Sequence, residues 1–198
     1  MSWSPLDRSA PHEFIKEAIR LFKERKGKVI VEIGCIRQRF SHSLDTEPID
    51  CPSRLDGHST ALFAETGARF YTCDIDPKAI GLAKEYVGEL HNVTILQKDG
   101  LKFLKTFGQK IDLLALDAFD VDQPGSAQNH LRCYQIAKRR LHKDSIVWID
   151  DTDVDFINGK LQPSPKGEYG GKGRLLVPLM IKEGWKVHRS GRCTILIK

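Results

Sequence analysis

The chain has 198 residues, of which 40% are hydrophobic and 29% are charged, and its formal net charge is +5. This composition is ordinary for a globular domain and excludes collagen-like and disordered chains, and no apolar run approaches the ~18–20 residues that a membrane span needs. The first residues lack the pattern of a secretory signal, and five widely spaced cysteines without a Cys-x-x-Cys pair fit a reducing compartment, so we expect a cytoplasmic protein.

Strand and helix patterns alternate along the chain. An N-terminal helical segment over 9–27 carries an apolar stripe in 11–25, and a β-branched run at 28–33 predicts the first strand. Further strands are predicted at 69–74, 93–96, 111–116 and 145–149, and helices at 59–65, 77–87, 101–107, 127–141 and 175–183.

These repeats predict one α/β domain over residues 1–198, a three-layer sandwich with a doubly wound, mostly parallel sheet of seven strands. The last two strands, 185–188 and 193–197, are joined by too few residues for a parallel crossover and must form an antiparallel C-terminal hairpin. The polar stretch 37–56 is long for a loop and is either a surface insertion or a lid over a ligand. Basic residues dominate from 159 onward, which indicates either a solvated basic face or an anion-attracting rim near the substrate.

Acidic residues follow all five of the predicted parallel strands. They are Glu32, Asp74, Asp99, Asp117 and the pair Asp150 and Asp151. One acid at a strand end means little, because Asp commonly caps helices. The carboxyl ends of parallel strands meet at one edge, where open α/β sheets bind their ligands, so we expect this edge to be the ligand site.

The residues at this edge also narrow the class of ligand. The turn after the first strand contains one glycine, Gly34, and no Gly-x-Gly-x-x-Gly or Gly-Lys-Ser/Thr pattern, which argues against a dinucleotide or a bound phosphate. Asp74 suits a ribose with both hydroxyls free, and Asp99 can accept a hydrogen bond from an exocyclic amine such as that of adenine. These acids together indicate an adenosine without a pyrophosphate.

At this point the sequence resembles the class I S-adenosylmethionine-dependent methyltransferases. The matching segments are residues 29–34, 71–80, 93–100 and 111–117, within a resemblance that covers about 11–198. The resemblance implies a Rossmann-like methyltransferase fold and S-adenosylmethionine (SAM) as the cofactor. It also implies that Glu32 and Gly34 lie under the methionine end of SAM, that Asp74 binds the ribose and that Asp99 faces the adenine, with Asp117 beside them.

The glycine-rich turn of that family is interrupted here by the 37–56 segment. The sequence then resumes with Gly57, His58 and Ser59, which we interpret as a displaced second half of the turn. Backbone N–H groups at the following helix start would bind the carboxylate of SAM.

A narrower resemblance points to the metal-dependent catechol-type and caffeoyl-CoA-type O-methyltransferases. The segments that carry it are residues 116–120, Tyr134, 147–152 and 159–160. It implies that a divalent cation is held by Asp117, Asp150 and Asp151. Independently of any family, three crowded carboxylates repel one another unless they are protonated or bridged by a cation, and such hard oxygen ligands suit Mg²⁺.

A cation there would lower the pKa of a substrate hydroxyl, so that its oxygen attacks the sulfonium methyl, with Asp117 and Asp150 as catalytic residues. The alternative interpretation is that these acids cap helices or bind the substrate without metal. The sequence thus predicts a SAM-dependent methyltransferase that acts on a small-molecule acceptor, at oxygen and with a divalent cation. The rivals are a metal-independent N- or C-methyltransferase and a non-catalytic nucleoside or nucleic-acid binding module. We expect no membrane or nucleic-acid partner, and a homodimer is compatible with the sequence.

Overall fold

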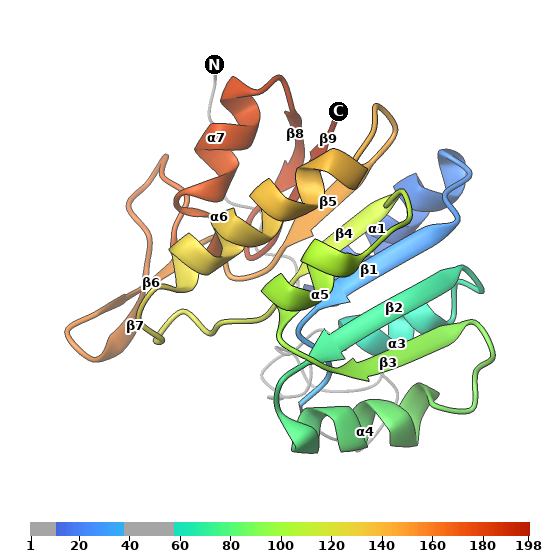
Figure 1. Cartoon of the computed structure of the whole chain (residues 1–198). Coiled ribbons are helices and arrows are strands. Elements are labelled where there is room, and N and C mark those ends of the chain that lie inside the picture. The colour runs from blue at the N-terminus through green and yellow to red at the C-terminus, as the bar shows by residue number, and fades with distance from the viewer. Residues whose placement is uncertain (1–10, 38–57) are drawn as a thin grey trace.

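The computed structural model describes residues 11–37 and 58–198. Within these residues, seven strands form one sheet in the order β3-β2-β1-β4-β5-β9-β8 (Figure 1). The strands are β1 Val29–Ile33, β2 Arg69–Asp74, β3 Val93–Gln97, β4 Leu113–Leu116, β5 Ile146–Ile149, β8 Lys186–Ser190 and β9 Thr194–Ile197. The first five strands pair in parallel, and β9 runs antiparallel to both β5 and β8. The predicted sheet and its antiparallel C-terminal hairpin are confirmed.

Helices cover both faces of the sheet (Figure 1). One face carries α1 Pro11–Glu24, α3 Ser59–Ala64 and α4 Pro77–Val87, and the other carries α5 Gly100–Thr106, α6 Ser126–Ala137 and α7 Leu176–Lys182. Side chains alternate along a strand, so Val31 of β1 packs in the α5–α7 core and Ile30 packs in the α1–α3 core. The same alternation turns Glu32 toward α3.

The chain between β5 and α7 contains a two-stranded hairpin that is not among the predicted elements. Strands β6 Val154–Ile157 and β7 Lys160–Pro163 pair antiparallel and project from the body of the molecule (Figure 1). The two residues between them, Asn158 and Gly159, both have positive φ, at 52° and 77°. An Asn-Gly pair between short strands favours this turn, so the sequence did contain the signal.

Other departures from the predicted elements are confined to their ends. The predicted helix 127–141 begins at Ser126, and after Ala137 it tightens into the 3₁₀ turn η1 Lys138–Arg140. A second 3₁₀ turn, η2 Gly171–Gly173, precedes α7. In the described ranges 11–37 and 58–198, no helix has both the length and the apolar character of a membrane span.

Candidate functional site

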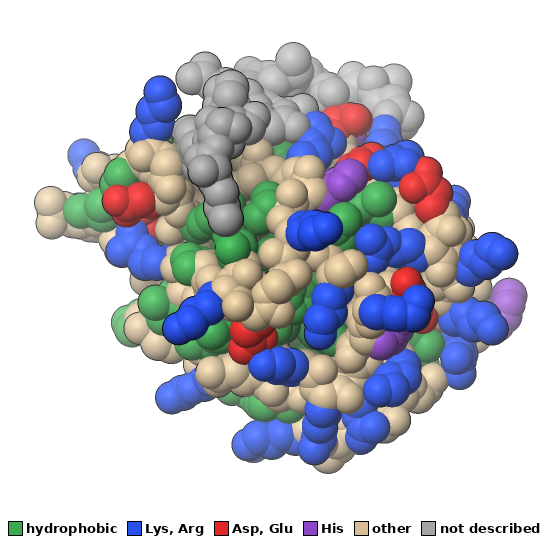
Figure 2. Space-filling model, turned by 90° about the horizontal axis from the view of Figure 1, so that it is seen from above, with side chains coloured by type: hydrophobic (Ala, Val, Ile, Leu, Met, Phe, Trp, Pro, Cys, Tyr) green, Lys and Arg blue, Asp and Glu red, His purple; other side chains and the backbone are tan. Residues whose placement is uncertain are grey.

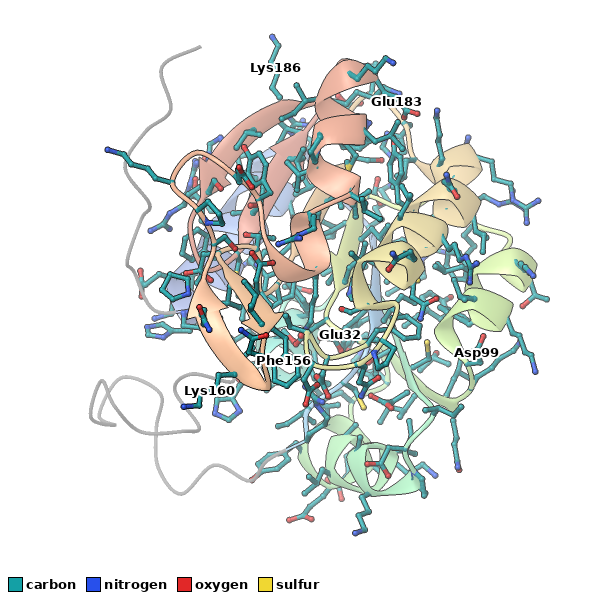
Figure 3. All side chains as sticks on the ribbon, turned by 90° about the vertical axis from the view of Figure 1, so that its left-hand side faces the viewer. Glu32, Asp99, Phe156, Lys160, Glu183 and Lys186 are labelled. Carbon is teal, nitrogen blue, oxygen red and sulfur yellow. The ribbon has the colours of Figure 1, made fainter. Side chains whose placement is uncertain are left out.

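The turn after β1 requires a glycine at position 34. Gly34 has a φ of +90°, and its N–H donates to the carbonyl of Cys73 on β2 at 2.9 Å. A Cβ at this position would lie 2.6 Å from the backbone nitrogen of Ala118 and 2.8 Å from the carbonyl oxygen of Asp117. Only glycine lets this turn approach the end of β4 so closely, and the approach brings the ends of β1 and β4 together at the edge seen in Figure 3.

Glu32 is a buried anchor in the structure. Its carboxyl group is fully buried and accepts hydrogen bonds from three hydroxyls, those of Ser59 (2.6 Å), Thr60 (2.8 Å) and Thr72 (2.6 Å). Burial raises the pKa of Glu32 to about 8, against the opposing effect of the three hydrogen bonds. These contacts give Glu32 a positioning role between β1, β2 and α3, and its place under the methionine end of SAM stays a prediction.

The turn after β1 contacts the start of α3, although the 37–56 segment separates them in sequence. The N–H of Ile36 donates to the hydroxyl of Thr60 at 2.9 Å, which ties the turn after β1 to the start of α3. His58 caps α3 with a left-handed backbone (φ 47°), and the side chains of His58 and Ser59 are both buried. The predicted contacts of this segment with SAM stay predictions, and the burial of both side chains favours contacts through the backbone. Gly57 lies outside the described residues.

The ends of β2 and β3 carry carboxylates with acceptor capacity to spare. Asp74 accepts from the N–H of Cys35 (3.2 Å) and of Asp76 (2.9 Å) and is half-buried. Asp99 caps α5 by accepting from the N–H of Lys102 at 2.8 Å. A carboxylate offers about four acceptor positions, so each side chain can bind further donors.

An apolar side chain stands beside these acceptors. Ile75, the residue after Asp74, is 71% exposed, which is unusual for isoleucine. Asp99 lies on one side of the edge and the hairpin residues Phe156 and Lys160 on the other, with Glu32 between them (Figure 3). The edge therefore combines hydrogen-bond acceptors and an apolar surface at its β2–β3 end.

The predicted acid triad forms after β4 and β5. The ligand atoms of Asp117, Asp150 and Asp151 all lie within 4.8 Å of one another, and their side chains are only 14%, 10% and 15% exposed. Asp151 reaches this position with a left-handed backbone, at a φ of 48°. Such crowding of carboxylates needs a positive charge nearby.

That charge comes from Lys172, one of the basic residues that follow position 159. Its fully buried Nζ lies 2.5 Å from Oδ1 of Asp117, 3.0 Å from Oδ2 of Asp151 and 3.9 Å from Oδ2 of Asp150. The guanidinium of Arg192 also pairs with Asp151. Although burial opposes ionisation, the three carboxylates raise the pKa of Lys172 above its ordinary value.

The pKa values of Asp150 and Asp151 are shifted in opposite directions. Burial, followed by the charges of Asp151 and Asp117, raises the pKa of Asp150 well above its usual range. Burial acts in the same direction on Asp151, but Lys172 and Arg192 outweigh it and lower the pKa of Asp151. Lys172 and Arg192 thus stabilise the ionised form of Asp151 more than that of Asp150.

The predicted divalent cation does not fit this arrangement. The ammonium group of Lys172 stands where a metal ion would meet Asp117 and Asp151, and two cations that close together repel strongly. Asp150 in turn accepts from the thiol of Cys193 at 3.0 Å. All three acids already have partners within the chain, which argues against the predicted metal ion, while the catalytic roles of Asp117 and Asp150 stay predictions.

A buried histidine lies near the same cluster. Nδ1 of His130 is 2.9 Å from the carbonyl oxygen of Ser126, which can only accept, so Nδ1 carries the hydrogen and Nε2 the lone pair. Among the described residues, Nε2 has no hydrogen-bond partner. Burial and the charge of Lys172 lower the pKa of His130 to about 3, so its ring stays neutral.

A cavity of about 270 Å³ opens between the start of α6 and the β6–β7 hairpin. Its lining mixes apolar side chains, such as Val121 and Phe156, with polar ones, such as Gln123 and Ser126. The lining also contains a cation, Arg174, which pairs with Asp155 at 2.6 Å.

The basic residues that follow position 159 divide into two groups. Lys172 and Arg192 pair with the acids that follow β4 and β5, and the half-exposed Arg174 pairs with Asp155 of β6, so all three are counterions of acids in the chain. Figure 2, which looks down on the end of the molecule where α7 and β8 lie in Figure 1, shows many other Lys and Arg side chains spread over the surface. Sequence analysis missed the first group, although the uncompensated triad indicated that a cation must lie nearby.

Comparisons with known proteins agree with this fold. A family model described as the spermine/spermidine synthase domain matches residues 60–159. No curated protein sequence matches the chain.

Solved structures of methyltransferases superpose on most of the chain. The SAH-bound methyltransferase PaMTH1 from Podospora anserina is 18% identical, with a TM-score of 0.58 over 93% of this chain and 77% of that one. The O-methyltransferase from Bacillus cereus, in complex with SAH, is 15% identical, with a TM-score of 0.58 over 99% and 84%. The N-methyltransferase NodS from Bradyrhizobium japonicum WM9 is 14% identical, with a TM-score of 0.56 over 93% and 92%. At these identities the likeness establishes the fold alone. The O- and N-methyl transfer named for two of these proteins is a property of those proteins.

Proposed function

Because the chain belongs to the spermine/spermidine synthase domain family and has the class I SAM-dependent methyltransferase fold, we propose that it transfers a methyl group from SAM to a small molecule. The observation that carries this proposal is the acceptor-lined end of the edge, where Asp74 and Asp99 follow the neighbouring strands β2 and β3 and the exposed Ile75 comes directly after Asp74. These residues match the donors and the flat apolar ring of an adenosine.

Each part of the nucleoside has a partner at this edge. Asp74 would accept hydrogen bonds from the ribose hydroxyls, Asp99 would accept from the adenine amine, and Ile75 would cover the face of the ring. The turn that Glu32 holds in place would receive the methionine end. When bound, SAM supplies an electrophilic sulfonium methyl group. The chain's part is to place a nucleophile in line with it, since positioning provides much of the rate.

The cavity beside the β6–β7 hairpin supports a small acceptor. A volume of about 270 Å³ has room for a small acceptor molecule. Its apolar lining residues and the cation of Arg174 favour an acceptor with an apolar body and a polar or anionic group. Since Lys172 fills the predicted metal position, we propose the metal-independent form of the reaction, with oxygen or nitrogen as the acceptor atom.

Isothermal titration calorimetry with SAM and with SAH tests this proposal. We expect both to bind with one site per chain, and we expect chelators to leave that binding unchanged. ADP is the control, because the turn after β1 offers no phosphate-binding pattern. Tight binding of ADP together with no heat from SAM or SAH would contradict the proposal.

Two rivals give different results in simple assays. The family description names polyamine synthases, and a polyamine would need free carboxylates, whereas those after β4 and β5 are paired with Lys172 and Arg192. We therefore expect spermidine to leave the melting temperature unchanged. The basic surface in Figure 2 favours a nucleic-acid binding module instead, and binding to DNA or RNA that falls steeply with salt would support that rival.

A further inference from the structure

The side chains of Asp117, Asp150, Asp151 and Lys172 form a closed group, here called the ion cluster. Nζ of Lys172 donates to Oδ1 of Asp117 at 2.5 Å and lies 3.3 Å from the carbonyl oxygen of the same residue. It also contacts Asp151 at 3.0 Å and Asp150 at 3.9 Å. Contacts with three carboxylates and a carbonyl oxygen are the surroundings that a hard metal ion takes in proteins.

The backbone holds Lys172 in this position. Gly171 has a φ of +39°, and a Cβ there would lie 2.4 Å from the carbonyl oxygen of Asp151. The N–H of Lys172 donates to that same carbonyl at 3.2 Å, and the N–H of Gly170 donates to the carbonyl of Thr152 at 2.8 Å. The segment between β7 and α7 (Figure 1) thus lies directly on the chain that follows β5. Lys172 enters the ion cluster from a fixed backbone, and its side chain is fully buried.

The formal charges of the ion cluster and its neighbour explain what Lys172 does. Three carboxylates carry three negative charges, and Lys172 and Arg192 supply two positive ones. The guanidinium of Arg192 pairs with Asp151, at the end of β5. Removal of the ammonium group alone would leave two uncompensated formal negative charges when all three carboxyl groups are ionised, as they are when they bind a metal ion, and these equal the charge of one divalent cation.

We propose that Lys172 is a built-in cation that takes the place of a divalent metal ion in the ion cluster, so that loss of its ammonium group turns the cluster into a divalent-cation site. This inference concerns metal binding and does not depend on the proposed methyl transfer. A failure of SAM to bind and a failure of this inference are therefore separate results.

The test is Mn²⁺ binding by electron paramagnetic resonance and calorimetry, with wild type beside Lys172→Ala. Wild type is expected to bind no Mn²⁺ in the ion cluster at millimolar concentration. Lys172→Ala is expected to bind one Mn²⁺ per chain at least about tenfold more tightly than wild type. Mn²⁺ should also raise the melting temperature of Lys172→Ala and leave that of wild type unchanged.

Matched variants locate the site. Lys172→Ala/Asp117→Asn removes a ligand and should lose the gained Mn²⁺ binding, whereas Lys166→Ala removes an exposed lysine and should behave as wild type. Lys172→Gln, whose amide oxygen can itself ligate a hard cation, should also gain a site. If Lys172→Ala folds only when metal is present, that result supports the inference.

Two outcomes would overturn the inference. The first is wild-type protein that binds Mn²⁺ and loses it on Asp117→Asn, because the ammonium group would then not replace the metal. The second is that Lys172→Gln folds but binds no Mn²⁺, while Lys172→Ala either folds and binds no Mn²⁺ or stays unfolded when Mn²⁺ is added.

Discussion

Nζ of Lys172 lies 2.5 Å from Oδ1 of Asp117, although 55 residues separate the two in sequence. The contact joins the end of β4 to the glycine-flanked segment before α7. It supplies the positive charge that the acids after β4 and β5 require, and it does so without a metal ion. The local sequence around Asp117 resembles a metal-binding edge, whereas the assembled fold provides the cation from its own chain.

Replacement of Lys172 by methionine should destabilise the protein. The methionine side chain fills a similar space but leaves Asp117, Asp150 and Asp151 with less compensation, and breaking a buried ion pair in this way costs about 3–5 kcal/mol. Urea denaturation in the absence of divalent ions measures the loss. Lys166→Met, at an exposed position, is the control, and equal free energies of unfolding for the two variants would show that the pairing contributes little.

Asp74→Asn should weaken the binding of SAM and SAH. The substitution removes a charge-assisted acceptor at the proposed ribose site, for an expected loss of about 1–3 kcal/mol, or roughly 5- to 150-fold in Kd. Calorimetry measures the change. Asp76→Asn is the matched control, because Asn also caps helices well and Asp76 caps α4 by accepting from the N–H of Lys78. An Asp74→Asn variant that keeps the wild-type Kd would remove Asp74 from the site.

Glu32→Gln should change how stability depends on pH. The pKa of Glu32 is about 8 in the folded protein and returns to its ordinary value of 4.5 on unfolding. Between these values the folded chain keeps a proton that the unfolded chain releases. Stabilisation by this group is therefore complete below pH 4.5 and is lost as the pH rises through 8.

Glutamine cannot ionise, so the stability of wild type relative to Glu32→Gln should fall by up to about 4 kcal/mol as the pH rises from about 5 to about 9. Chemical denaturation at several pH values measures the difference. All other titratable groups are common to both proteins. Parallel stability curves would mean that Glu32 has the same protonation state in the folded and unfolded chains.

His130 should hold one tautomer and stay neutral. Its Nδ1–H donates to the carbonyl of Ser126, and its pKa is lowered to about 3 by burial and by Lys172. In ¹⁵N-labelled protein we expect the His130 ring to show the Nδ1–H form with no titration between about pH 5 and 8. The ring of His91, which is exposed, is the comparison in the same spectra. A His130 ring that titrates near neutral pH would contradict its placement.

The sheet could be predicted because its signals are local. The β-branched run of β1 and the acid after each parallel strand follow directly from residue order, and so do the short link between β8 and β9 and the resulting antiparallel pair. The β6–β7 hairpin was also encoded locally, by Asn158 and Gly159, although it was not among the predicted elements. Helix ends such as that of α6 depend on packing and were less certain.

The sequence predicts where the site lies, but it predicts the roles of the site's residues only in part. Residue order places Glu32 at the end of β1, but its hydroxyl partners come from α3 and β2, so its closure from solvent depends on tertiary packing. The same holds for Lys172, whose partners precede it by as many as 55 residues. A requirement for positive charge was visible in the sequence, whereas the residue that meets it was not.

The proposal that the edge formed by Gly34, Asp74 and Asp99 binds SAM is tested most directly by a crystal structure of the wild-type chain with SAH. We predict electron density for a nucleoside at this edge, with the ribose hydroxyls within hydrogen-bond distance of the Asp74 carboxylate. Density for SAH on another surface, or an edge without SAH in crystals grown at saturating ligand, would contradict the account.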